Sequence, residues 1–171
     1  MTSTMRFDKW ENSLGQPYGT VLQVVSTTKT DTFSLASTTF TAIPNLSITI
    51  TPKSTSSKIL IMTSINTGSD QNNVAIMQRL MRDTTPVGVG DAAGSRIQAN
   101  TLRIASSTGT LSVLSSYQFL DSPSTTSPIT YSVQLRGENA TTFYVNRTIT
   151  DTDNANYARS SSTITLMEIA Q

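Results

Sequence analysis

Apolar side chains alternate with hydroxyl side chains at a period of two residues in much of this chain. The clearest examples are residues 46–51, with the sequence LSITIT, and residues 129–136, with the sequence ITYSVQLR. Successive side chains of a β-strand point to opposite faces of its sheet, so this period indicates strands with one buried face. The chain also contains 24 Ser and 30 Thr, and β-branched Thr favours strands. The pattern predicts an all-β protein.

Weaker runs of the same kind fill most of the remaining chain, and clusters of Ser, Thr, Asn, Gly and Pro separate them. About ten short strands joined by such turns are typical of an antiparallel sandwich or barrel. We expect one jelly-roll-like β-sandwich, because 171 residues suit a single domain. The weaker predicted strands are residues 20–26, 38–43, 57–65, 74–83, 95–105, 110–120, 141–149 and 161–170.

One of these segments, residues 74–83 with the sequence VAIMQRLMRD, also fits a second type of structure. Its apolar residues Ile76, Met77, Leu80 and Met81 have the spacing of one face of a helix. We predict a strand because every neighbouring run has strand character. A helix is the alternative.

The first 19 residues differ from the rest, since they show neither the strand period nor the helix period. We expect residues 1–19 to form an extended N-terminal docking arm and residues 20–171 to form the β-sandwich domain. Aromatic side chains near the centre of an interface carry a disproportionate share of binding energy. The predicted partner-binding residues of the arm are therefore Phe7, Trp10 and Tyr18.

The composition excludes many catalytic mechanisms. The chain has no His and no Cys, which rules out Ser-His-Asp and Cys-His catalysis, thiolate zinc sites, iron–sulfur clusters and disulfides. We therefore predict a protein that is not an enzyme and that holds no cofactor and no metal. Glycoside hydrolysis by a pair of carboxylates stays open as a minor alternative, because it needs only two acids at the right separation.

The charge pattern gives no indication of nucleic-acid or membrane partners. The net charge is +1, and the basic residues are scattered rather than clustered. The longest aliphatic run is residues 59–62, and no apolar segment follows Arg6. We expect neither a signal peptide nor a spanning helix.

Two segments resemble ligand-binding motifs without meeting their requirements. GVGDAA, at residues 88–93, fits a G-x-G-x-x-A pattern, but no apolar strand precedes it and no helical pattern follows it. We predict a structural turn. Residues 151–156 place four oxygen-bearing side chains together, as in a Ca²⁺ loop, but Ser162 stands where that loop needs a bidentate Glu. A polar loop with Asx turns is the better interpretation.

Charged and aromatic residues in the predicted strands also allow two interpretations. Arg82, Asp83 and Arg147 lie in apolar surroundings, where ion pairs within the domain or between subunits are expected and ligand binding is the alternative. Tyr side chains in strands usually pack, although exposed ones can stack on sugar rings. We predict packing for Tyr117, Tyr144 and Tyr157.

The amino-acid sequences of several predicted strands and turns resemble those of a known family. In order these are VLQVVSTTKTDTFS, LSITITPKSTSSKILI, RDTTPVGVGDAAGSR, FLDSP, TTSPITYSVQLR, FYVNRT and STITLMEIA, within residues 20–170. Together they resemble small β-domain virion structural or fibre-like proteins of marine and cyanobacterial tailed phages. The resemblance implies a non-enzymatic jelly-roll component of a phage particle, assembled as a homotrimer, and it implies no catalytic residue.

These observations predict a capsid decoration or cement protein that docks on the shell through its arm. Its partners would be other copies of itself and the major capsid protein or other virion proteins. The expected location is the virion, assembled in the host cytoplasm. The main alternative is a tail-fibre or receptor-binding tip that binds a host-surface saccharide.

Overall fold

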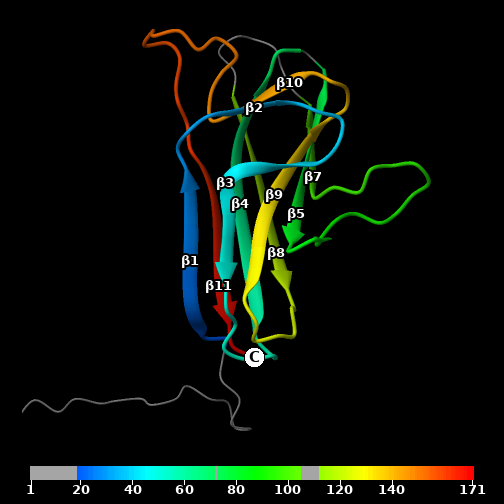
Figure 1. Cartoon of the computed structure of the whole chain (residues 1–171), viewed down its shortest axis with the longest axis vertical. Coiled ribbons are helices and arrows are strands. Elements are labelled where there is room, and N and C mark those ends of the chain that lie inside the picture. The colour runs from blue at the N-terminus through cyan, green and yellow to red at the C-terminus, as the bar shows by residue number, and fades with distance from the viewer. Residues whose placement is uncertain (1–18, 72, 105–111) are drawn as a thin grey trace, which may run out of the picture.

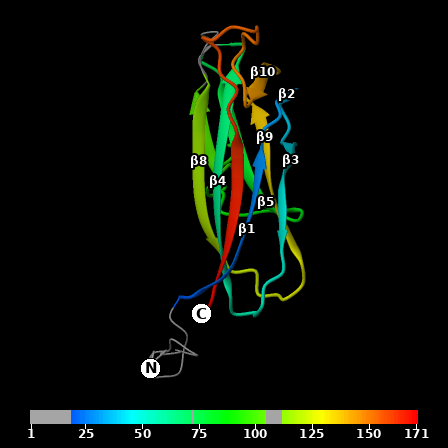
Figure 2. The ribbon, with the colours of Figure 1, turned by 90° about the vertical axis from the view of Figure 1, so that its left-hand side faces the viewer.

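Eleven strands and no helix occur in the part of the chain that the computed structural model describes, which is residues 19–71, 73–104 and 112–171 (Figure 1). The all-β prediction is confirmed. The described residues accordingly contain no helix of the length and hydropathy needed to cross a membrane. The strands form two antiparallel sheets that face each other as layers (Figure 2).

The first sheet is built around the 12-residue strand β4. One side of β4 pairs with β8, and the other side pairs with two strands in succession, β11 near the start of β4 and β10 near its end. β1 continues the sheet beyond β11, and β2 continues it beyond β10. The bounds are β1 Val21–Lys29, β2 Phe33–Ala36, β4 Lys58–Ser69, β8 Val113–Asp121, β10 Thr142–Val145 and β11 Ser162–Ile169.

The second sheet has β9 at its centre, between β3 and β5. The free side of β5 pairs with two short strands, β6 and β7. The bounds are β3 Thr41–Ile50, β5 Ala75–Arg82, β6 Thr85–Pro86, β7 Thr101–Ile104 and β9 Ile129–Gly137.

The strand order is that of a jelly roll. The main strands run β1-β11-β4-β8 in one sheet and β3-β9-β5-β7 in the other. Consecutive strands of the chain therefore alternate between the sheets for much of its length, as in a sandwich of two Greek keys. The predicted β-sandwich is confirmed.

The core lies between the sheets and is lined by the inward residues of each strand. On β4 these are Ile59, Ile61 and Ile65, and on β9 they include Tyr131 and Val133, each with at most 1% of its surface exposed. The outward positions of β9 carry Thr, Ser, Gln and Arg. Burial of apolar side chains on one face of each strand is the main force that joins the two sheets.

Several predicted boundaries need correction. The separate predicted strands 38–43 and 46–51 form one strand, β3, whose register shifts between Ala42 and Ser47. Asn45 has a φ of 60° there, which Asn tolerates better than most residues. The segment 74–83 is a strand and not a helix. The predicted strand 95–105 reduces to β7 in the described residues, because a loop occupies 87–100.

The sandwich has two distinct ends. The N–H of Ala170 donates to the carbonyl of Thr20, so the residues before β1 and after β11 meet at one end of the sandwich, which we call the base. Residues 146–161, which connect β10 to β11, form a long loop at the opposite end, and we call it the tip loop (Figures 1 and 2). Gly19, the first described residue, lies at the base.

Candidate functional site

The outward face of β1, β11, β4 and β8 carries an apolar row close to the base. The sheet register places Val24 beside Met167, Met167 beside Leu60, and Leu60 beside Leu120. Val24 is 53% exposed and Leu120 is 46% exposed, while Leu60 and Met167 between them are half-buried. We call this surface the base face. It is an apolar surface on which the described residues place no other strand or loop.

The base face is almost free of charge. Lys58 is the only charged side chain among the outward positions described on these four strands, and the remaining polar positions hold Ser, Thr, Gln and Asn. Charged residues are depleted at the centres of protein interfaces, because buried charges need partners. The base face is therefore suited to contact another protein surface.

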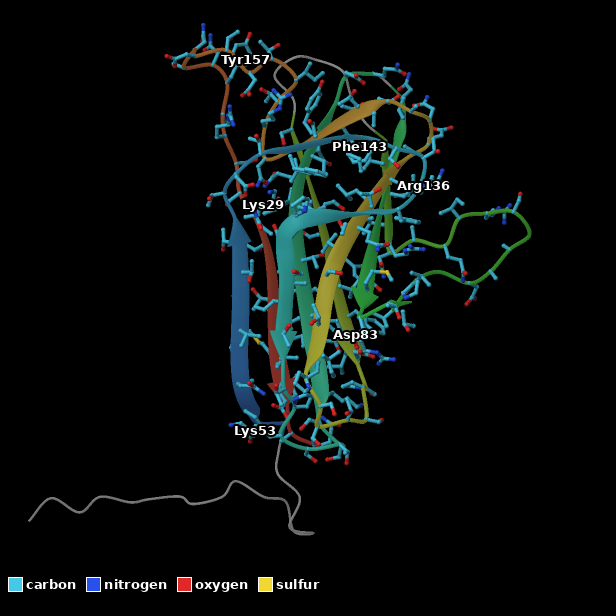
Figure 3. The ribbon with its side chains drawn as sticks, viewed as in Figure 1. Lys29, Lys53, Asp83, Arg136, Phe143 and Tyr157 are labelled. Carbon is cyan, nitrogen blue, oxygen red and sulfur yellow. The ribbon has the colours of Figure 1, made fainter. Side chains whose placement is uncertain are left out.

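A buried carboxylate holds the base together beneath this surface. Glu168 is fully buried, and its carboxylate accepts hydrogen bonds from the Gln23 side-chain amide at 2.6 Å and from the Lys53 backbone N–H at 2.7 Å. Burial alone would raise the pKa of Glu168, but these hydrogen bonds hold it below its ordinary value. The network fixes the 51–57 turn, where Lys53 is seen in Figure 3, against β1 and β11.

The predicted arm is not placed by the structure. Residues 1–18, with Phe7, Trp10 and Tyr18, lie outside the described residues, and only Gly19 of the predicted arm is described. Gly19 precedes β1 at the base, where Val21 is 49% exposed and pairs with Ile169. Gly19 thus lies next to the base face.

The tip loop does not have the ligand set of a calcium site. Asp151, the first acid of the proposed calcium motif, is bound by Arg159 at 2.7 Å and by Arg147 at 3.0 Å. The backbone N–H of Asn156 donates to the Asn154 side chain, which is the predicted Asx turn. No group of three or more acidic residues that could hold a metal occurs in the described residues.

The tip loop does contain a hollow of about 280 Å³, lined by Asp151, Thr152, Asp153, Asn154, Tyr157, Ala158 and Arg159. Its lining is mainly polar, and Tyr157 projects at the far end of the molecule (Figure 3). Tyr144 instead lies beneath Arg147, whose guanidinium carbon is 4.2 Å from its ring centroid. Tyr117 packs against the core, as predicted for a strand tyrosine.

The glycine-rich segment 88–93, predicted as a structural turn, lies in the irregular loop 87–100, and no helix follows it in the described residues. Gly88 has a φ of 63°, and its carbonyl accepts a 2.6 Å hydrogen bond from the Tyr117 hydroxyl. A Cβ at this position would lie 2.5 Å from the Tyr117 oxygen and 2.7 Å from the Phe119 ring. Only glycine therefore fits between the turn and β8.

The predicted ion pairs form within the domain. Arg82 of β5 binds both oxygens of Asp121 on β8, at 3.0 and 2.9 Å, and Asp121 is 6% exposed. Asp83 instead accepts a hydrogen bond from the backbone N–H of Thr130. Asp121 ends β8 and faces inward, so this polar side chain at the strand end makes the contact between the two sheets.

The base face is not among the sites predicted from the sequence. The available signal was the KILIM run at residues 58–62, in which Leu60 and Met62 occupy positions where most other strands carry hydroxyls. An uninterrupted apolar run predicts a strand covered on both faces. The row itself depends on pairing between distant strands, which the residue pattern does not specify.

No family model matches the chain, and no curated protein matches it. Among solved structures, T=1 particles derived from infectious bursal virus are similar, with 11% identity and a TM-score of 0.46 over 98% of this chain and 41% of that one. The Gx strain of infectious bursal disease virus gives 12% identity and a TM-score of 0.43 over 98% of this chain and 42% of that one. These neighbours are β-rich viral capsid proteins, and this chain spans less than half the length of each.

Proposed function

We propose that this chain is a non-enzymatic structural protein of a tailed-phage virion, and that it decorates or cements the capsid shell as a homotrimer. Its partners are other copies of itself and the major capsid protein, and it acts on the particle after assembly in the host cytoplasm. The base is the end that docks, and the tip loop faces outward.

The observation that carries this proposal is the base face. An uncharged apolar row crosses four strands of one sheet, and it lies beside the point where the arm joins the sandwich. The occupant that fits it is a protein surface of matching apolar character, since the row itself is apolar and Lys58 is the one charged side chain among the outward positions described on these strands. Further support comes from the resemblance of the strands to phage virion proteins.

The arm supplies the second part of the docking contact in this proposal. Eighteen residues precede Gly19, enough to reach about 60 Å if extended. Phe7, Trp10 and Tyr18 would anchor it in the shell, beside the area covered by the base face. A chain that lacks residues 1–19 should remain a trimer and lose affinity for the shell.

A tail-fibre or receptor-binding tip is the second candidate function. The hollow in the tip loop favours it, because Tyr157 and Arg159 offer a ring and a guanidinium beside hydrogen-bonding side chains. In that case the same protein would bind a host-surface saccharide at the end remote from the base. It would also be present in few copies.

The proposal is tested by rebinding the purified chain to phage capsids stripped of it. We expect Leu60→Lys with Met167→Lys to abolish rebinding, because two charges would be buried against the shell. Thr152→Lys, at the exposed tip loop, is the matched control and should rebind normally. Leu60→Ser with Met167→Thr replaces the two apolar side chains with hydroxyl side chains like those at neighbouring outward positions. This variant should also weaken rebinding, and it should disturb folding less than the two lysines do.

Thermal unfolding of each variant shows that it is folded before rebinding is compared. Normal rebinding of both base-face variants would overturn docking through the base. Loss of rebinding in Thr152→Lys alone would favour contact through the tip loop instead.

A further inference from the structure

The outer face of the second sheet carries two arginines around one aromatic ring. The guanidinium carbon of Arg79, on β5, lies 4.0 Å from the centroid of the Phe40 ring, and that of Arg136, on β9, lies 6.0 Å from it. Both arginines are half-buried. Arg136 is seen at the side of the sheet in Figure 3.

Apolar side chains extend this cluster toward the sheet edge. The register places Met77 beside Arg136 on one side and beside Leu102 on the other. Leu102 is 60% exposed. We call Phe40, Met77, Arg79, Leu102 and Arg136 the arginine patch. Aromatic residues, Met and Arg are the residue types enriched in protein interfaces.

The charge of the arginine patch is not neutralised within the described chain. Neither Arg79 nor Arg136 forms an ion pair with any described residue, whereas Arg82, Arg147 and Arg159 all do. The Nε and Nη2 atoms of Arg79 donate to the neutral Gln134 oxygen at 3.2 and 2.7 Å. Burial lowers the pKa of Arg79, which indicates a charge with reduced access to water.

An exposed acid projects from the same molecule, on a loop that also carries the exposed Arg96. Residues 87–100, which we call the side loop, stand away from the sandwich at the right of Figure 1. Asp91 on this loop is exposed and has no ion pair with any residue that the structure describes, and Ile97 is 48% exposed. The loop is held in shape by backbone hydrogen bonds from Gly90 to Ala99 and from Arg96 to Ala93.

We propose that the arginine patch receives the side loop of a second copy of this chain, with the Asp91 carboxylate between Arg79 and Arg136 and with Ile97 on Met77 and Leu102. The two surfaces are different parts of the chain, so the contact is heterologous and closes into a ring when its rotation allows. This inference gives the proposed homotrimer its subunit contact and rests on that proposal. Guanidinium–carboxylate geometry supplies its specificity.

The test is the oligomeric state of the full chain, measured by sedimentation velocity over a range of protein concentrations. Arg136→Glu and Asp91→Arg should each raise the concentration needed for assembly by about tenfold or more, as expected for like charges at a close pair. The double variant, which carries both exchanges, should assemble at a protein concentration closer to the one that the original chain needs. Asp153→Arg, another exposed acid on a loop, is the control and should assemble normally.

Arg136→Gln and Asp91→Asn provide milder versions if a charge reversal impairs folding. Each should also weaken assembly, and added salt should weaken assembly of the original chain. The inference is overturned if the original chain is monomeric throughout, if the single variants assemble as it does, or if the double exchange restores nothing.

Failure of this inference is distinguishable from failure of the proposed function. A chain that is monomeric in solution but rebinds stripped capsids through the base face removes only the subunit contact. A chain that assembles through the side loop but never binds capsids removes only the docking role.

Discussion

The hydroxyl of Tyr131 donates a 2.6 Å hydrogen bond to the carboxylate of Asp121, and this bond joins the two sheets inside the sandwich. Tyr131 belongs to β9 of the second sheet, and Asp121 ends β8 of the first sheet, so the bond connects strands that do not pair with each other. Burial, followed by the bond to Asp121, raises the pKa of Tyr131 far above its ordinary value. The hydroxyl is therefore protonated and remains a hydrogen-bond donor at neutral pH.

Removal of this carboxylate should be costly. Asp121→Ala leaves the half-buried Arg82 guanidinium and the buried Tyr131 hydroxyl without their acceptor, and we expect it to lower the free energy of unfolding by about 3–5 kcal/mol. Urea denaturation measures this. Arg159→Ala, which removes an exposed partner of Asp151, is the control and should cost about 1 kcal/mol or less. Equal losses in the two variants would contradict the role assigned to Asp121.

The buried Glu168 predicts how stability depends on pH. Its pKa in the folded protein lies below the ordinary value of 4.5. As the pH falls, the Glu168 carboxylate therefore becomes protonated in the unfolded chain at a higher pH than in the folded protein. The stabilisation that this group gives above pH 4.5 is lost as the pH decreases toward its folded-state pKa.

Urea denaturation at a series of pH values tests this dependence. In Glu168→Gln the part of the acid dependence that comes from this group should disappear, and stability at neutral pH should fall by about 1–3 kcal/mol because the hydrogen-bond network is broken. An unchanged acid dependence in Glu168→Gln would contradict the assignment. Between pH 5 and 8 the original chain should vary little, because it has no His.

Asn146 connects the strands where the first sheet divides below the tip loop. It is fully buried with a φ of 62°, its side-chain amide donates to the carbonyls of Lys29 and Asp31, and its side-chain oxygen accepts from Ser162. Asn146→Gly loses the side-chain hydrogen bonds but adopts the positive φ without strain. Asn146→Ala loses the same hydrogen bonds and also strains the backbone at this φ. We expect the Ala variant to be less stable than the Gly variant by about 1 kcal/mol or more. Equal stability would show that the backbone conformation costs nothing.

Calcium should have no effect on this protein. Arg147 and Arg159 both bind the Oδ2 atom of Asp151, so two cationic groups already neutralise this carboxylate and would repel a third cation. Unfolding temperatures measured with added Ca²⁺ and with a chelator should agree. A rise with Ca²⁺ that Asp151→Asn abolishes would contradict the interpretation of the tip loop as a polar loop.

The strands that sequence analysis predicted well are those with a strong local pattern. Residues 129–136 alternate strictly and form all but the last residue of β9, and residues 161–170 contain the whole of β11. β2 and β6 were missed because they have only 4 and 2 residues and depend on pairing with β10 and β5. Local periodicity does not record such pairing.

Both candidate surfaces depend on register between distant parts of the chain. Leu60, Leu120 and Met167 form one row only because β8 and β11 flank β4. Arg79 and Arg136 approach the same ring only because β5 pairs with β9. The partner-binding residues predicted from the sequence are instead Phe7, Trp10 and Tyr18, which lie outside the described residues.

The most direct test of the central claim is the copy number of this chain in purified phage particles that contain it, measured by gel densitometry against the major capsid protein. A decoration or cement protein should be present in numbers comparable to the shell subunits, and stripping it should leave weaker capsids. A chain found in only a few copies, with intact shells after its removal, would contradict shell decoration and assign it to the tail.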